Sequence, residues 1–121
     1  MPTRSLTPGE RDTVERLLDE CAFDAKSLRA QADSAEVWNI NEDGSIVRFE
    51  NSPLAPSAPT PLMHFVLVEA TAMDKDGVTI HVLLHVRKGR LYELEYFRED
   101  TNPMLRTPEA NDLIGFVVSA Q

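Results

Sequence analysis

Three successive runs of alternating apolar and polar residues constrain the fold of this chain more than any other feature. The runs occupy residues 63–72, 78–86 and 91–97, and a period of two is typical of β-strands. The joints between them, Lys75-Asp76-Gly77 and Arg87-Lys88-Gly89, are too short for a crossover, so neighbouring strands must be antiparallel. We expect both joints to be three-residue loops closed by a glycine in the left-handed conformation. The sequence therefore predicts a β-meander over residues 62–98.

The second joint decides which face Glu93 and Glu95 occupy. A two-residue turn at Lys88-Gly89 would place both carboxylates among the valines and leucines, and burying unpaired carboxylates is costly. We therefore predict the three-residue loop. Its register aligns three apolar rows on the inner face: Val66, Val68, Ala70 and Ala72; Ile80, Val82, Leu84 and Val86; Tyr92, Leu94 and Tyr96.

The opposite face of this meander is the candidate binding surface. We expect His81 to lie opposite Glu95, and a histidine–carboxylate pair can act as an acid–base couple or as part of a metal site. His81 and His85 lie about 13 Å apart along a strand, however, so they cannot share one metal. No third ligand has chelating spacing, and we expect no metal, no cofactor and no catalytic residue. The predicted binding residues are Phe65, Leu67, Glu69, His81, Leu83, His85, Glu93 and Glu95.

The first third of the chain predicts helices within residues 7–33. Thr7-Pro8-Gly9-Glu10 fits a capping box with proline at the first helical position. We expect a second, shorter helix capped by Asp24. The predicted buried stripe of the first helix is Val14, Leu17, Leu18 and Cys21, and that of the second is Ala25, Leu28 and Ala32.

Residues 36–50 predict a β-hairpin, because Asp43-Gly44 is a strong two-residue turn signal. With that turn, Ile40 opposes Val47 and Trp38 opposes Phe49, which puts four large apolar side chains on one face. An alternative interpretation is a calcium loop, since part of the EF-hand pattern is matched by Asn39, Asn41, Asp43, Gly44, Ile46 and Glu50. The neutral first ligand and the prolines after the last one favour the hairpin.

Two segments complete the predicted organisation. Residues 51–61 contain four of the eight prolines and predict an extended loop within one domain. The C-terminal tail, residues 105–121, contains the apolar run 113–118, which is compatible with a short helix, a last strand or both. We therefore predict a single α+β domain over residues 1–121, with one or two N-terminal helices packed on a mainly antiparallel sheet of about five or six strands.

Charge and composition exclude several functional classes. Twenty acidic against twelve basic residues give a net charge of −8, which disfavours nucleic-acid binding. Residues 1–15 have no apolar core, so we expect no signal peptide, and we expect no membrane span because no apolar run approaches the ~18–20 residues that one needs. The single cysteine permits no internal disulfide, and a cytoplasmic location is the expectation. Because no nucleophile elbow or phosphate-binding loop is present, we predict that the protein is not an enzyme.

Two stretches of the sequence are similar to a known family. The block of residues 84–100, with Gly-Arg-Leu-Tyr-Glu-Leu-Glu inside it, and the opening Leu6-Thr7-Pro8-Gly9-Glu10-Arg11 resemble small uncharacterised bacterial proteins of a domain-of-unknown-function family. The resemblance implies an α+β cytoplasmic domain and carries no site residues. In size, acidity and architecture the chain is also similar in type to bacterial toxin-immunity proteins.

Two functional hypotheses follow. The first is a non-catalytic acidic interaction protein, an immunity-type inhibitor that binds a basic toxin, because an acidic surface speeds association with a basic partner. The alternative is a small-molecule-binding or hydrolytic domain that uses the His/Glu cluster of the open sheet face. Neither hypothesis involves nucleic acid or membrane, and a homodimer through the same face is a further alternative.

Overall fold

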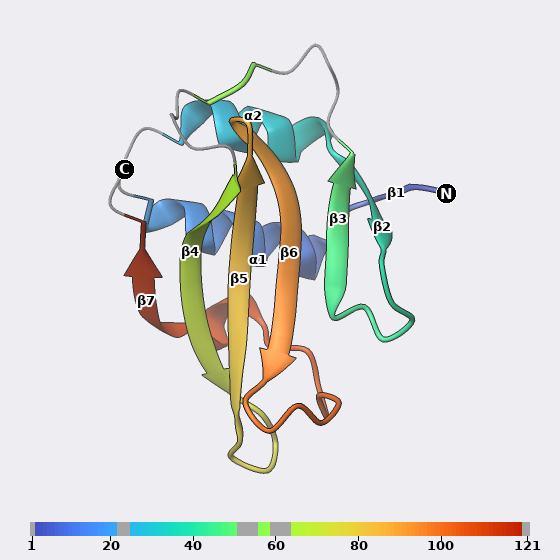
Figure 1. The fold of residues 1–121 in the computed structure, drawn as a ribbon, viewed down its shortest axis with the longest axis vertical. Helices are drawn as coiled ribbons and strands as arrows, with labels where there is room; N and C mark the ends of the chain where they lie inside the picture. Colours follow the sequence, from blue (N-terminus) through green and yellow to red (C-terminus); the bar gives the residue numbers. More distant parts are fainter. Residues whose placement is uncertain (1, 22–24, 51–55, 59–63, 120–121) are drawn as a thin grey trace.

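The structure, a computed structural model, describes residues 2–21, 25–50, 56–58 and 64–119. Helices pack on one face of a seven-stranded antiparallel sheet with the order β1-β2-β3-β6-β5-β4-β7 (Figure 1). The helical elements are α1 (Pro8–Asp19), α2 (Lys26–Ser34) and the 3₁₀-helix η1 (Ala110–Asp112). The strands are β1 (Arg4–Ser5), β2 (Glu36–Asn39), β3 (Ile46–Glu50), β4 (His64–Met73), β5 (Thr79–Arg87), β6 (Arg90–Arg98) and β7 (Ile114–Val118).

The α+β class is confirmed, but the predicted strand number of five or six is wrong. The two edge strands account for the difference. β1 has two residues, which is too short to produce an alternating pattern. The tail forms both a 3₁₀ turn and a strand, and β7 pairs with β4 at the other edge of the sheet. None of the described helices is long and apolar enough to cross a membrane.

The N-terminal helices follow the predicted pattern. Thr7 Oγ1 accepts a hydrogen bond from Glu10 N, and the Glu10 carboxylate accepts one from Thr7 N, which completes the capping box. The predicted cap Asp24 lies outside the described residues. Of the predicted stripes, Val14, Leu17, Leu18, Ala25, Leu28 and Ala32 are buried, and Cys21 packs against them from the edge.

A buried glutamine connects the helix layer to the sheet. Gln31, on the inner side of α2, has no exposed surface. Its Nε2 donates to Pro56 O and Gly89 O, and its Oε1 accepts from Leu91 N, at 2.8–2.9 Å. Because Ala58 N also donates to Gly89 O, the described part of the proline-rich segment lies against the β5–β6 turn.

The meander forms as predicted, with one of its two joints corrected. Residues 75–77 form the expected three-residue loop, in which Gly77 has a φ of +85°. The second joint is instead a two-residue turn, because Arg87 pairs with Arg90 across Lys88 and Gly89, which both have positive φ.

A β-bulge in β6 compensates for that shorter turn. The register shifts between the pairs Val86–Leu91 and His85–Glu93, so that Tyr92 is the extra residue. The shift returns Glu93 and Glu95 to the face away from the core, which is the face predicted for them. The prediction that Tyr92 lies on the inner face is wrong for the same reason.

The β2–β3 hairpin has a different register from the predicted one. Val37, rather than Trp38, pairs with Phe49 and is buried, and Ile40 is exposed. The connection is longer than two residues because Asn41 organises it: its side chain accepts from Ile46 N and donates to Ser45 Oγ. The EF-hand alternative is excluded, since Glu50 pairs with Glu36 at the far end of β3 from this loop.

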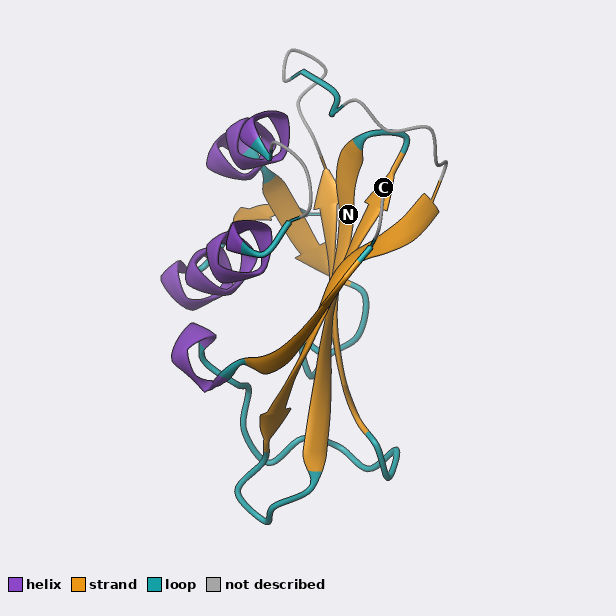
Figure 2. Ribbon diagram, turned by 90° about the vertical axis from the view of Figure 1, so that its left-hand side faces the viewer, coloured by secondary structure: helices purple, strands orange, loops and turns teal. Residues whose placement is uncertain are grey.

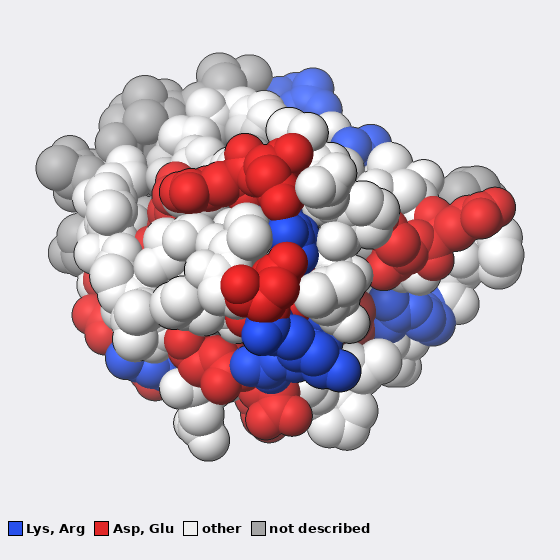
Figure 3. Space-filling view, turned by 90° about the horizontal axis from the view of Figure 1, so that it is seen from below, with Lys and Arg blue, Asp and Glu red and all other residues white. Residues whose placement is uncertain are grey.

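An ion-pair cluster lies at the lower end of the molecule. Arg98, buried at the end of β6, pairs with Asp74, Asp76 and Asp100 at 2.6–3.0 Å. Asp74 also accepts hydrogen bonds from the Leu105 and Arg106 amides, which fixes the loop after β6. Acidic side chains form several patches on this end, with basic side chains between them (Figure 3).

Candidate functional site

The candidate site is the sheet face opposite the helices, which we call the outer face. Figure 2 shows α1, α2 and η1 on one side of the sheet, and in the described part of the chain no helix or strand covers the other side. Six of the eight predicted binding residues lie there: Glu69, His81, Leu83, His85, Glu93 and Glu95.

Phe65 and Leu67 were predicted for the outer face, and this prediction is wrong. The register of β4 against β5 shifts between Val66 and Val68, so the phase of the alternation reverses there. Leu67 has no exposed surface, and Phe65 lies opposite Val86 and packs against the core. Val66, opposite His85, occupies the outer face instead.

The structure adds residues to the outer face that sequence reasoning missed. Arg48 of β3 binds Glu93 at 2.6 Å and lies over the ring of Tyr92, 4.7 Å from its centroid. Trp38 pairs with Arg48 and extends the face toward the sheet edge. The pairing of β3 with β6 joins strands that are distant in sequence, so no local pattern could have revealed these contacts.

His81 lies at the centre of one of two histidine–carboxylate groups. It pairs with Thr71 on β4, and its partner on β6 is Phe97 rather than the predicted Glu95. Its Nδ1 lies 2.9 Å from Glu69 and its Nε2 lies 2.9 Å from Glu99. Burial disfavours the charged imidazolium, but these two carboxylates outweigh it and raise the pKa of His81 above 6.5.

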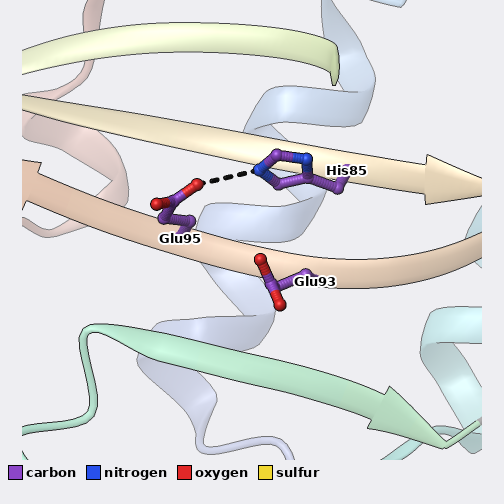
Figure 4. A group of neighbouring side chains, drawn as sticks. All are labelled: His85, Glu93 and Glu95. Atoms are coloured by element: carbon purple, nitrogen blue, oxygen red, sulfur yellow. Dashed lines mark hydrogen bonds and ion pairs between the residues drawn. The ribbon is translucent and has the colours of Figure 1, made fainter. Parts of the chain in front are cut away.

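The second group consists of His85, Glu93 and Glu95 (Figure 4). His85 Nε2 lies 2.9 Å from a Glu95 oxygen, and one ligand atom from each of the three residues lies within 4.8 Å of the others. The expectation that no third ligand has chelating spacing rested on a register with Glu95 opposite His81, and the observed register brings Glu93 and Glu95 to His85 instead. His64 Nε2 lies 3.4 Å from His85 Nδ1, behind the group.

Apolar side chains surround the polar groups of the outer face. Phe97 stacks on His81 with ring centroids 4.8 Å apart and remains 43% exposed. On β7, Val117 pairs with Glu69 and is 66% exposed, and Ile114 pairs with Thr71 and is 59% exposed. An uncovered surface that mixes exposed apolar residues with ion pairs is suited to contacts with another molecule.

Cavities lie elsewhere on the molecule. One of about 290 Å³ lies between the β2–β3 loop and the loop after β6, beside Phe97 and Arg98. Another, of about 330 Å³, lies between the start of α1 and Pro108. Neither is lined by a histidine, so neither extends the two histidine–carboxylate groups of the outer face into a pocket.

Comparison with known proteins identifies a family and no closer relative. No curated protein and no solved structure matches the chain. One family model matches residues 3–108, which include both helices and the strands β1 to β6. The expected resemblance to a domain-of-unknown-function family is thereby confirmed, and the chain belongs to the family described as domain of unknown function DUF6984.

Proposed function

We propose that the protein is a non-catalytic binding domain whose outer face docks on another protein. The observation that carries the proposal is a sheet face that no described helix or strand covers, on which exposed Phe97, Val117 and Ile114 lie beside carboxylates. Large exposed apolar side chains cost free energy in a monomer unless a partner covers them. Leu83, half-buried at the middle of β5 between Glu69 and Glu95, lies near the centre of the face.

The partner that best fits this face is a basic protein. The chain has a net charge of −8, and on the outer face Glu69, Glu95 and Glu99 form ion pairs with histidines, which are charged only when protonated. A partner carrying lysine or arginine would be steered to such a surface and would pair with these carboxylates. An immunity-type inhibitor that neutralises a basic toxin in a bacterial cytoplasm is the form of this function that we propose.

The alternative of a hydrolytic site receives less support. It required His81 to face Glu95, whereas both ring nitrogens of His81 are engaged by Glu69 and Glu99. It also required a loop or the tail to fold over the outer face. The tail instead extends the sheet as β7.

The experiment is to express the chain together with the protein encoded beside it in the genome, and to measure binding and growth protection. Leu83→Arg should reduce binding at least about tenfold, because a central interface residue often contributes more than ~1.4 kcal/mol and arginine repels a basic partner. The fold should tolerate arginine, since Glu69 and Glu95 flank the site. Leu105→Arg is the matched control, because Leu105 is exposed in the loop after β6.

Two results would contradict the proposal. The first is a folded Leu83→Arg variant that binds and protects as well as the unchanged protein. The second is that the protein encoded beside this chain is acidic, or that it binds the Leu83→Arg variant and the Leu105→Arg control equally weakly.

A further inference from the structure

The two histidine–carboxylate groups of the outer face each contain one histidine and two glutamates, but the glutamates are placed differently around the histidine ring. In the first, Glu69 binds Nδ1 and Glu99 binds Nε2 of His81. The carboxylates therefore lie on different edges of the ring, and an ion bound to either nitrogen would reach only one of them. In the second, His85, Glu93 and Glu95 each bring one ligand atom to a common point (Figure 4).

From this contrast we propose that His85, Glu93 and Glu95 form a binding site for a divalent first-row transition metal ion, with Zn²⁺ as the best match. One imidazole nitrogen with two carboxylate oxygens is a donor set that zinc accepts. Three protein ligands leave at least one coordination position for water or for a group from another molecule. The site goes beyond the proposed docking function and stands independently of it.

The spacing of the three groups suits an ion of this size. Zinc binds nitrogen at about 2.0–2.1 Å and oxygen at about 2.0–2.2 Å, so the ligand atoms of a tetrahedral site lie roughly 3.3–3.6 Å apart. The ligand atoms here lie within 4.8 Å of one another, and His85 Nε2 is already 2.9 Å from a Glu95 oxygen. Small side-chain rotations of the glutamates, without movement of the backbone, would complete the coordination.

Residues around the group orient its ligands as residues around known metal sites do. A metal on Nε2 leaves the His85 proton on Nδ1, from which it can be donated to His64 Nε2, 3.4 Å away. Arg48 holds one oxygen of Glu93 at 2.6 Å, and the carboxylate has a second oxygen with which to bind the ion. Second contacts of this kind commonly change metal affinity by about 10–100-fold.

Electrostatics also favours a cation at this point. Glu93 is compensated by the permanently charged Arg48. Glu95, in contrast, meets the imidazole of His85, which is charged only when protonated. With a neutral His85 the group therefore carries an excess negative charge, which a bound divalent cation would balance.

The test is calorimetric titration of Zn²⁺ into the full chain, repeated with Co²⁺ to record its visible spectrum. We expect one site per chain, loss of binding in His85→Ala and Glu95→Gln, and an affinity about tenfold lower in His64→Ala. His81→Ala is the matched control. His81 lies on the same strand as His85 and also contacts two carboxylates, but its removal should leave metal binding unchanged. The Co²⁺ spectrum should show nitrogen and oxygen ligands without thiolate absorption, which separates this site from Cys21.

The proposal is wrong if the unchanged protein takes up neither ion, or if the ion remains bound in His85→Ala. It is equally wrong if His81→Ala and His85→Ala weaken binding to the same extent. Circular dichroism of each variant checks that the sheet is intact, and Glu95→Gln, which keeps the shape of the side chain, tests the site even if His85→Ala unfolds. Because the readout needs no protein partner, failure of the docking function leaves this test unaffected.

Discussion

Replacing Gln31 by methionine, an exchange that nearly preserves side-chain volume, should destabilise the protein because it removes a buried amide. The amide of Gln31 satisfies Pro56 O, Gly89 O and Leu91 N, and methionine satisfies none of them. Each buried backbone group left without a partner costs about 1–3 kcal/mol. Water can reach Pro56, which is exposed, and Gly89 O keeps its hydrogen bond from Ala58 N, so we expect a total loss of about 1–3 kcal/mol in the free energy of unfolding.

A loss of this size is a large part of the total stability of a domain, about 5–15 kcal/mol. Urea denaturation followed by circular dichroism measures it directly, and the melting temperature should fall by roughly 3–12 °C. Ser34→Met, at the exposed end of the same helix, is the control and should change stability by less than about 0.5 kcal/mol. Gln31→Glu should regain stability as the pH falls, because only the protonated carboxyl donates to the carbonyls. If Gln31→Met unfolds at the same urea concentration as the unchanged protein, the reasoning is refuted.

Three further predictions concern the turns, acid pH and His81. Gly89→Ala should destabilise the protein clearly more than Gly77→Ala, as measured by urea denaturation: both glycines have positive φ, but a Cβ at Gly89 would lie 2.5 Å from Ala58 O, whereas one at Gly77 meets nothing closer than 3.8 Å. Burial of Asp74 opposes its ionisation, but hydrogen bonds from backbone amides and Arg98 outweigh this and lower its pKa to about 2. The contribution of the ionised carboxylate to stability is therefore complete above the ordinary pKa of 3.8 and should be lost between about pH 4 and pH 2. Asp74→Asn should flatten this part of the curve of unfolding free energy against pH. In an NMR titration, His81 should ionise above pH 6.5, and the combined Glu69→Gln and Glu99→Gln exchange should lower its pKa; a pKa unmoved by that exchange would show that the carboxylates do not cause the shift.

The sequence predicts the faces of the meander well because burial free energy enforces them. Leu84 and Leu94 are fully buried, as expected, and Glu93 and Glu95 avoid the core. Placing a carboxylate in that core would cost several kcal/mol, so the chain adopts whichever turn and bulge prevent it. The face on which Glu93 and Glu95 lie is thus strongly determined, even though the three-residue loop predicted at residues 87–89 is wrong.

Gln31 shows a different limit of sequence reasoning. It lies three residues after Leu28 and just before Ala32, on the buried stripe of α2. A polar residue at such a position signals a buried hydrogen-bond partner. Its partners, however, are backbone groups of Pro56, Gly89 and Leu91, and backbone groups have no sequence signature. The pattern could therefore have identified Gln31 as unusual without showing what it binds.

The pairing partners on the outer face could not be predicted from the sequence, because they depend on the register between β5 and β6. The predicted register placed His81 opposite Glu95, whereas the observed one places it opposite Phe97 and brings Glu95 beside Leu83, a shift of two residues. Beyond the bulge, a two-residue shift leaves the side chains of residues 93–98 on the same face, so the hydrophobic pattern of these residues cannot detect it. The choice is made instead by the positive φ of Lys88 and Gly89 and by the bulge at Tyr92. That same shift sets His85 opposite Glu93 and within 2.9 Å of Glu95. The convergence of His85, Glu93 and Glu95 therefore depends on the two turn residues and on the bulge, which set the register of β6 against β5.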